Sequence, residues 1–177
     1  AQGKLVLAFG DPVLRDRVLN SRLDMRTPRT ITSPTALREE LARVRSRGWA
    51  VAPGESLVGV NALAAPIFEG GGHMVGAIAL LGSIQFIEAE PSEAQIRRVC
   101  LAAARSEVLR RVGWDVEADG LFGAPPIKVV IGDDAHTTVF SALQLLGLGH
   151  DRVVRVATDA QGRIEAEAFA VALKAGE

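Results

Sequence analysis

The residues of this sequence that could do chemistry are few and widely spaced. The three histidines, His73, His136 and His150, lie far from one another and from the single Cys100. Metal ions are held by such side chains at short, characteristic spacings, and none of those spacings occurs here. The sequence therefore predicts no metal centre.

Nucleophilic and phosphate-binding patterns are also missing. Ser83 and Ser141 lack a His/Asp partner pattern that would activate a hydroxyl. Gly147 and Gly149 follow a predicted helix and precede a predicted strand, which is the reverse of a dinucleotide-binding loop. We expect the chain not to be an enzyme by itself.

The composition of the 177 residues, 48% hydrophobic and 23% charged, is typical of a globular protein. A net charge of −1 favours neither nucleic acid nor an anionic membrane, so the Arg-rich runs "RVRSRG" and "LRRVG" are interpreted as solvated helix faces. No apolar run reaches the roughly 20 residues of a membrane helix. One cysteine cannot form an internal disulfide, which favours a cytoplasmic location. Because the sequence begins with Ala, within a predicted helix, we interpret it as a piece of a longer chain.

Capping signals mark the helices that would position any site in the first half. Asp11 followed by Pro begins a short helix, and Ser33 followed by Pro begins a longer one that ends at Gly48. Glu39 and Arg43 are predicted to pair on the exposed side of the second helix. The segment 27–32 between the helices is predicted to be an extended linker.

Two apolar runs, 57–68 and 74–83, flank the Gly-rich turn "EGGGH" and predict a β-hairpin. Both runs are apolar on both faces, so we expect both strands to be covered on both sides. Ser92 and Gln95 form a capping box that begins a long helix. That helix carries two apolar stripes in series, which predicts that its two halves bury different faces in two different cores. The alternative is a single helix sandwiched between layers. The stripes are Ile96, Val99, Cys100 and Ala103, then Leu101, Ala104, Val108 and Val112.

The pattern changes after residue 112. A loop over 113–126 precedes a strand over 127–132 and a helix over 133–147 that Asp133 or Asp134 would cap. A strand over 152–158 and a helix over 165–175 follow. Alternating strands and helices predict parallel packing, so the fold class is α/β, with an antiparallel hairpin and flanking helices first and a short βαβα segment second.

The first hundred residues resemble the effector-binding domain of IclR-type transcriptional regulators. The resemblance rests on "AQGKLVLAF", "LDMRTPRTIT", "ALREELARVRSRGWAV", "GVNALAAPIF" and "VGAIALLGSIQF", in this order and spacing. It implies a GAF-like sensor that binds a small carboxylate or aromatic acid, works as a homo-oligomer and signals to a winged helix-turn-helix. That DNA-binding part and the first part of the sensor are missing, so we expect no direct contact between this chain and DNA.

The resemblance also locates an effector site, and the chain departs from the family there. The family's acid, cysteine and two serines correspond to Ala52, Ala62, Ala79 and Leu81, all apolar. An apolar or aromatic effector, or none, is therefore expected. Amide groups near Gly3 and Lys4, at a helix start, could take a carboxylate. Glu55 and Asn61 are the nearby polar residues, and each is either part of the site or a solvated loop residue.

From about residue 101 the sequence resembles group II pyridoxal-phosphate-dependent decarboxylases, most clearly in "DDAHTTVFSALQLLGLG" and "DRVVRVATDAQGRI". In that family the histidine matching His136 stacks on the cofactor. The Schiff-base lysine, the phosphate loop and the acid on the pyridine nitrogen are absent, since Lys4, Lys128 and Lys174 match no such motif. The alternative for His136 is a helix-start residue that packs on its own helix.

The resemblances divide the chain into a partial effector-binding domain, 1–103, and a partial decarboxylase-like segment, 104–177. The leading function is small-molecule sensing for transcription regulation, with no cofactor. Pyridoxal phosphate would be the cofactor only if the second resemblance were functional. An inactive decarboxylase fragment and a non-functional hybrid are the alternatives.

Overall fold

The computed structural model describes residues 1–175, which divide into two compact units, 1–107 and 108–177. The first unit contains an antiparallel sheet and several helices, and the second contains a parallel strand pair with its own helices. In chain order the elements of the first unit are α1 (Gln2–Phe9), α2 (Pro12–Leu19), α3 (Pro34–Arg47), β1 (Ala50–Val51), β2 (Val60–Phe68), β3 (Met74–Ser83) and α4 (Glu93–Arg111), which continues into the second unit.

Local capping explains where the helices of the first unit begin and end. The side chain of Asp11 accepts a hydrogen bond from the amide of Val13, and the hydroxyl of Ser33 accepts one from Ala36, as the sequence predicts. Gly48 ends α3 with φ of 81°, a left-handed conformation that favours glycine. The capping box of α4 is confirmed, because Ser92 and Gln95 exchange side-chain-to-amide hydrogen bonds.

The sheet of the first unit has the order β1-β2-β3, with β2 in the middle. The predicted hairpin is confirmed, with Ala62 opposite Leu81 and Ala64 opposite Ala79, although β2 begins at Val60 rather than at 57. Coverage on both sides is confirmed only for β2. Leu81 on β3 is 75% exposed, because β3 lies at the edge of the sheet that residues 1–175 form.

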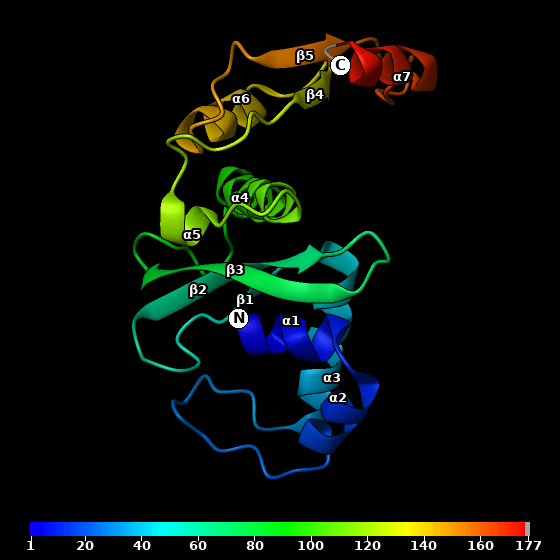
Figure 1. Cartoon of the computed structure of the whole chain (residues 1–177). Coiled ribbons are helices and arrows are strands. Elements are labelled where there is room, and N and C mark those ends of the chain that lie inside the picture. The colour runs from blue at the N-terminus through cyan, green and yellow to red at the C-terminus, as the bar shows by residue number, and fades with distance from the viewer. Residues whose placement is uncertain (176–177) are drawn as a thin grey trace. The chain divides into compact units, whose positions relative to one another are not determined.

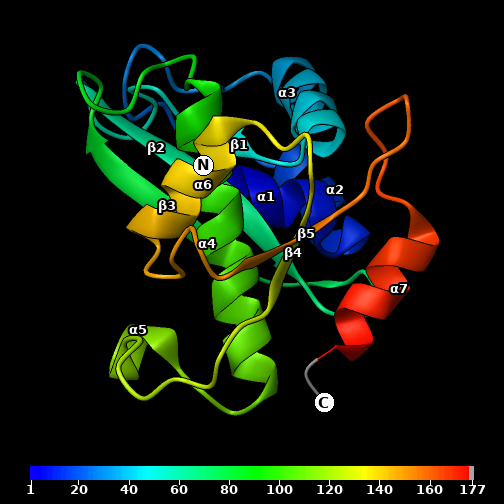
Figure 2. The same cartoon turned by 90° about the horizontal axis from the view of Figure 1, so that it is seen from above.

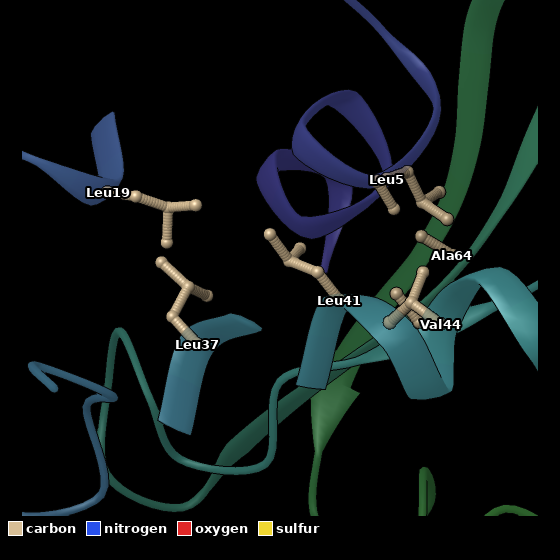
Figure 3. Packing of buried hydrophobic residues seen from close by; sticks show 8 residues of the cluster. Leu5, Leu19, Leu37, Leu41, Val44 and Ala64 are labelled. Atoms are coloured by element: carbon tan, nitrogen blue, oxygen red, sulfur yellow. The ribbon is translucent and has the colours of Figure 1, made fainter. Parts of the chain in front are cut away.

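Helices cover the two faces of this sheet, α1 and α3 on one side and the first part of α4 on the other (Figure 1). Figure 3 shows the larger core, where α1, α2 and α3 meet the sheet. Its labelled members are Leu5, Leu19, Leu37, Leu41, Val44 and Ala64. On the other face, Val99 and Ala103 of α4 pack against Leu63 and Ala65 of β2.

The second apolar stripe of α4 is not a core. Val108 is 46% and Val112 63% exposed, so the prediction that they serve a second core is wrong. The buried side does change after Glu107, through Leu109, which is 1% exposed. At 100° per residue, Leu109 lies about 120° around the helix from Ala103. A change of buried face was therefore predicted correctly but on the wrong residues.

The second unit contains α5 (Val116–Asp119), β4 (Val129–Gly132), α6 (Thr137–Leu145), β5 (Val153–Val156) and α7 (Ala166–Lys174). The predicted parallel pairing is confirmed, with β4 and β5 in register from Val129↔Val153 to Gly132↔Val156. Within this unit, α6 lies at one end of the strand pair and α7 at the other (Figures 1 and 2). The predicted loop 113–126 contains the short α5, which the carboxylate of Asp115 caps. The predicted helix over 165–175 corresponds to α7.

The predicted cap of α6 is wrong. The helix begins at Thr137, and Nδ1 of His136, not a carboxylate of Asp133 or Asp134, accepts the amide of Thr138 at 3.3 Å. Asp133 lies in the preceding turn, where its amide donates to the carbonyl of Val156. The two acids precede the helix by too many residues to reach its first free amides.

Candidate functional site

Three of the four apolar positions predicted to face an effector form a row across the sheet. The amide of Ala52 donates to the carbonyl of Ala62 at 3.1 Å, and Ala62 lies opposite Leu81. Because side chains alternate along a strand, Ala52 and Ala62 share the face of Ala50 and Ala64, which α1 covers. We call Ala52, Ala62 and Leu81 the apolar row. It contains no hydrogen-bonding side chain.

Ala79 lies beside the row rather than in it. It is paired with Ala64, two residues along β2 from Ala62, and it packs against the core between α1 and the sheet. Its methyl group therefore already contributes to the hydrophobic core on this face.

Lys4 is buried at the start of α1, and its ammonium group has a full set of partners. Nζ donates to the carbonyl of Val51 at 2.8 Å, to Oε1 of Glu55 at 2.5 Å and to Oε1 of Glu40 at 3.3 Å. An ammonium has three protons to donate, so these bonds use all of them. The side chain of Lys4 thus has a structural role, as the buried ammonium that Glu40, Val51 and Glu55 surround. For a ligand, only its backbone amide and that of the exposed Gly3 remain.

Glu40 connects the ammonium of Lys4 to α3. Its carboxylate also accepts hydrogen bonds from Nε of Arg43 and from the guanidinium of Arg47, both at 3.0 Å. Burial alone would raise the pKa of Glu40, but Lys4, Arg43 and Arg47 outweigh burial and hold that pKa below its usual value. Arg43 therefore pairs with the buried Glu40, whereas the sequence predicted an exposed pair with Glu39.

The side chains of Asn61 and Glu55 both have partners within the protein. Asn61 is fully buried, and its side chain bonds to the amide of Ala52 and to the carbonyls of Ile87 and Glu88. It holds the segment after β3 against the sheet and is not a solvated loop residue. The carboxylate of Glu55, 17% exposed, is paired with Lys4. Neither residue is a solvated loop residue, and a role for either at an effector site stays a prediction.

A threonine pair fastens two loops together beside Glu55. The hydroxyl of Thr27 donates to the carbonyl of Gly54, and that of Thr30 donates to the carbonyl of Glu55, both at 2.6 Å. The hydroxyl of Thr30 also accepts the amide of Thr27 at 2.9 Å. The segment 27–32 is therefore an anchored turn rather than the extended linker that the sequence predicted. We call Thr27 and Thr30 the threonine staple.

The staple borders a pocket of about 320 Å³ in the first unit. Its walls come from the stapled turn, from the loop between β1 and β2, and from the residue after β3. The lining residues are Thr27, Pro28, Arg29, Gly54, Val58, Gly59 and Ile84. Sequence reasoning missed this pocket. The only signal was the pair of threonines three residues apart in "TPRT", which fits a side-chain-fastened turn.

The second unit does not fit pyridoxal phosphate. His136 is exposed, and its Nδ1 is used in capping α6. Nζ of Lys128 donates to the carbonyls of Leu173 and Ala175 at the end of α7. A pocket of about 110 Å³ in this unit has Leu109, Leu121 and Pro125 among its lining residues, and His136 is not one of them. Residues 1–175 contain no cluster of potential metal ligands and no helix suited to crossing a bilayer.

Comparison with known proteins finds relatives that are similar to part of the chain. The chain is 33% identical over 113 residues to the HTH-type transcriptional regulator RhmR of Escherichia coli strain K12, covering 63% of this chain and 43% of that protein. A crystal structure of an IclR transcriptional regulator from Silicibacter sp. TM1040 has 34% identity and a TM-score of 0.54, over 64% of this chain and 44% of that one.

A third relative has a ligand. The crystal structure of an IclR homologue from Microbacterium hydrocarbonoxydans, complexed with 4-hydroxybenzoate, is 29% identical to the chain, with a TM-score of 0.51 over 59% of this chain and 41% of that one. The chain thus spans less than half the length of these relatives. None of them supports the predicted resemblance to decarboxylases after residue 101. The family described as bacterial transcriptional regulator IclR, C-terminal, matches residues 1–107. This match covers more than half of the chain, and the chain shares the mixed α/β architecture of those structures. The chain therefore belongs to the IclR family.

Proposed function

We propose that residues 1–107 sense a small-molecule effector on behalf of a transcriptional regulator. The observation that carries the proposal is the apolar row, Ala52, Ala62 and Leu81, which lies on the sheet face at the positions where the family resemblance places the effector. The relative bound to 4-hydroxybenzoate supports an aromatic acid as the kind of effector.

The chemistry of the row narrows the effector class. A site without hydroxyl or carboxylate side chains cannot satisfy the several polar groups of a small keto acid, and unpaired polar groups are costly to bury. An apolar or aromatic body is suited to the row. The backbone amides of Gly3 and Lys4, in the first turn of α1, are the proposed partners of its carboxylate. Ala79 would border the same face.

The remaining parts of the proposal concern the whole regulator. DNA contact would come from a winged helix-turn-helix outside residues 1–177, in a cytoplasmic homo-oligomer that needs no cofactor. Light scattering during gel filtration tests the oligomer. A monomer at micromolar concentration would contradict that part.

A thermal-shift panel of aromatic and aliphatic carboxylates tests the sensing function. We expect at least one acid to raise the Tm, since a ligand that binds only the folded state stabilises it. Leu81→Asp, at a 75% exposed position in the row, should weaken that shift by repelling the acid. Leu80→Asp is the matched control, because Leu80 lies on the opposite face of β3. If no acid shifts the Tm, the chain is not an effector sensor of this class.

A further inference from the structure

The pocket beside the threonine staple has a composition that selects for one kind of ligand. Pro28, Val58 and Ile84 provide apolar walls, and Arg29 is the one charged residue among those that line it. The other polar side chain, Thr27, already uses its hydroxyl in donating to the carbonyl of Gly54. None of the residues that the family resemblance assigns to the effector lines this pocket.

The backbone of Arg29 is anchored beside this pocket. Its amide donates to the hydroxyl of Thr27 at 3.1 Å, so the staple also fixes the backbone of the residue that carries the charge. The stem of Arg29 lies across Gly54, where an added Cβ would come within 3.3 Å of Cδ of Arg29. Gly54 has φ of +67°, so glycine is suited to this position both by conformation and by space.

The guanidinium of Arg29 is available to a ligand. Arg29 is exposed, and no carboxylate within residues 1–175 pairs with it. By contrast, Lys4 is fully committed to Glu40, Glu55 and Val51. An arginine presents parallel N–H donors that match the two oxygens of a carboxylate.

We propose that this pocket binds an apolar or aromatic monocarboxylate, with the carboxylate on Arg29 and the apolar body against Pro28, Val58 and Ile84. The inference goes beyond the proposed function, because the pocket would be a second carboxylate site, separate from the effector site on the apolar row. The volume of about 320 Å³ lies within the range of small-molecule sites. A sugar acid would find too few polar partners on these walls.

Benzoate and benzamide are the probes, because they share a shape and differ in charge. Calorimetry on the full chain should show benzoate binding about tenfold or more tightly than benzamide, as expected for a charge-assisted contact. Arg29→Gln should bring the two affinities together. Arg26→Gln, an exposed arginine of the same turn that does not line the pocket, should leave the ratio unchanged. Amide NMR shifts on adding benzoate should be largest at Gly54 and Gly59.

The outcomes separate this inference from the proposed function. If Leu81→Asp abolishes benzoate binding and Arg29→Gln does not, the effector lies on the apolar row; sensing stands and the pocket assignment fails. If Arg29→Gln removes the preference for benzoate and Leu81→Asp does not, the pocket assignment is supported. If the wild-type chain binds neither benzoate nor any acid of the panel, both proposals are overturned.

Discussion

The ammonium of Lys4 lies 2.5 Å from a carboxylate oxygen of Glu55, although the two residues are 51 positions apart in the chain. The same nitrogen reaches Glu40, 36 positions away. One buried side chain of α1 thereby holds α3 and the loop after β1 together. The loop that it holds also forms a wall of the pocket, so we expect the position of that wall to depend on the ion pair between Lys4 and Glu55.

Replacing Lys4 with Met should destabilise the first unit by about 3 kcal/mol, because it leaves the carboxylate of Glu55 without its partner in a largely buried place. Urea unfolding followed by circular dichroism measures the loss. Glu55→Gln in the same chain should recover part of the loss, since a neutral amide costs less to leave unpaired. Arg22→Met, at a 94% exposed side chain, is the control. Equal stability of Lys4→Met and wild type would show that the pair contributes little.

Glu40 should make stability depend on pH. Its pKa is lowered in the folded state, so it contributes stability above the ordinary glutamate pKa and loses that contribution as the pH falls through the lowered value. The difference in unfolding free energy between wild type and Glu40→Gln should therefore be largest at neutral pH and shrink in that acidic window. Urea titrations at several pH values between neutral and strongly acidic measure it. A difference that stays constant with pH would contradict the lowered pKa.

Thr27→Val should loosen the pocket. The variant keeps the shape of the side chain but removes the donor to the carbonyl of Gly54, which costs about 1 to 3 kcal/mol for a buried bond. Amide hydrogen exchange should speed up at Arg29, whose amide loses its acceptor. Thr32→Val is the matched control, because the hydroxyl of Thr32 forms no hydrogen bond with any of residues 1–175. Unchanged exchange at Arg29 in Thr27→Val would rule out the staple as its anchor.

Substitutions at Leu109 and Val112 should destabilise the protein to very different extents. Leu109→Ala removes a fully buried side chain and should cost about 2 to 5 kcal/mol, whereas Val112→Asp changes a 63% exposed position and should cost less than about 0.5 kcal/mol. Thermal unfolding of both variants measures the contrast. A large loss in Val112→Asp would restore the second stripe of α4 as a core.

Sequence patterns predicted the features that depend on neighbouring residues. The caps at Ser33 and Ser92 and the hairpin up to Ser83 rest on contacts within a few positions, which the residue types specify directly. The family resemblance also pointed to Ala52, Ala62 and Leu81, which lie in a row across the sheet. No local sequence pattern relates these three positions to one another.

The rest depends on partners that are distant in sequence. Nothing near Lys4 indicates that its side chain will be buried, because its partners follow 36 to 51 residues later. The sequence does not distinguish Glu40 from its neighbour Glu39. Only the packing of α3 against α1 buries Glu40 and leaves Glu39 exposed. His136 capped α6 because the helix begins later than the acids before it suggested. Tertiary packing decides each of these cases.

The threonine staple holds the wall of the pocket without depending on the side chains of that wall. Thr27 and Thr30 hold the loop after β1 through the carbonyl oxygens of Gly54 and Glu55, and every amino acid supplies such an oxygen. A substitution at the 74% exposed Val58 therefore alters a wall of the pocket without removing any bond of the staple. The side chain of that wall can therefore be varied while the hydrogen bonds that support the loop remain.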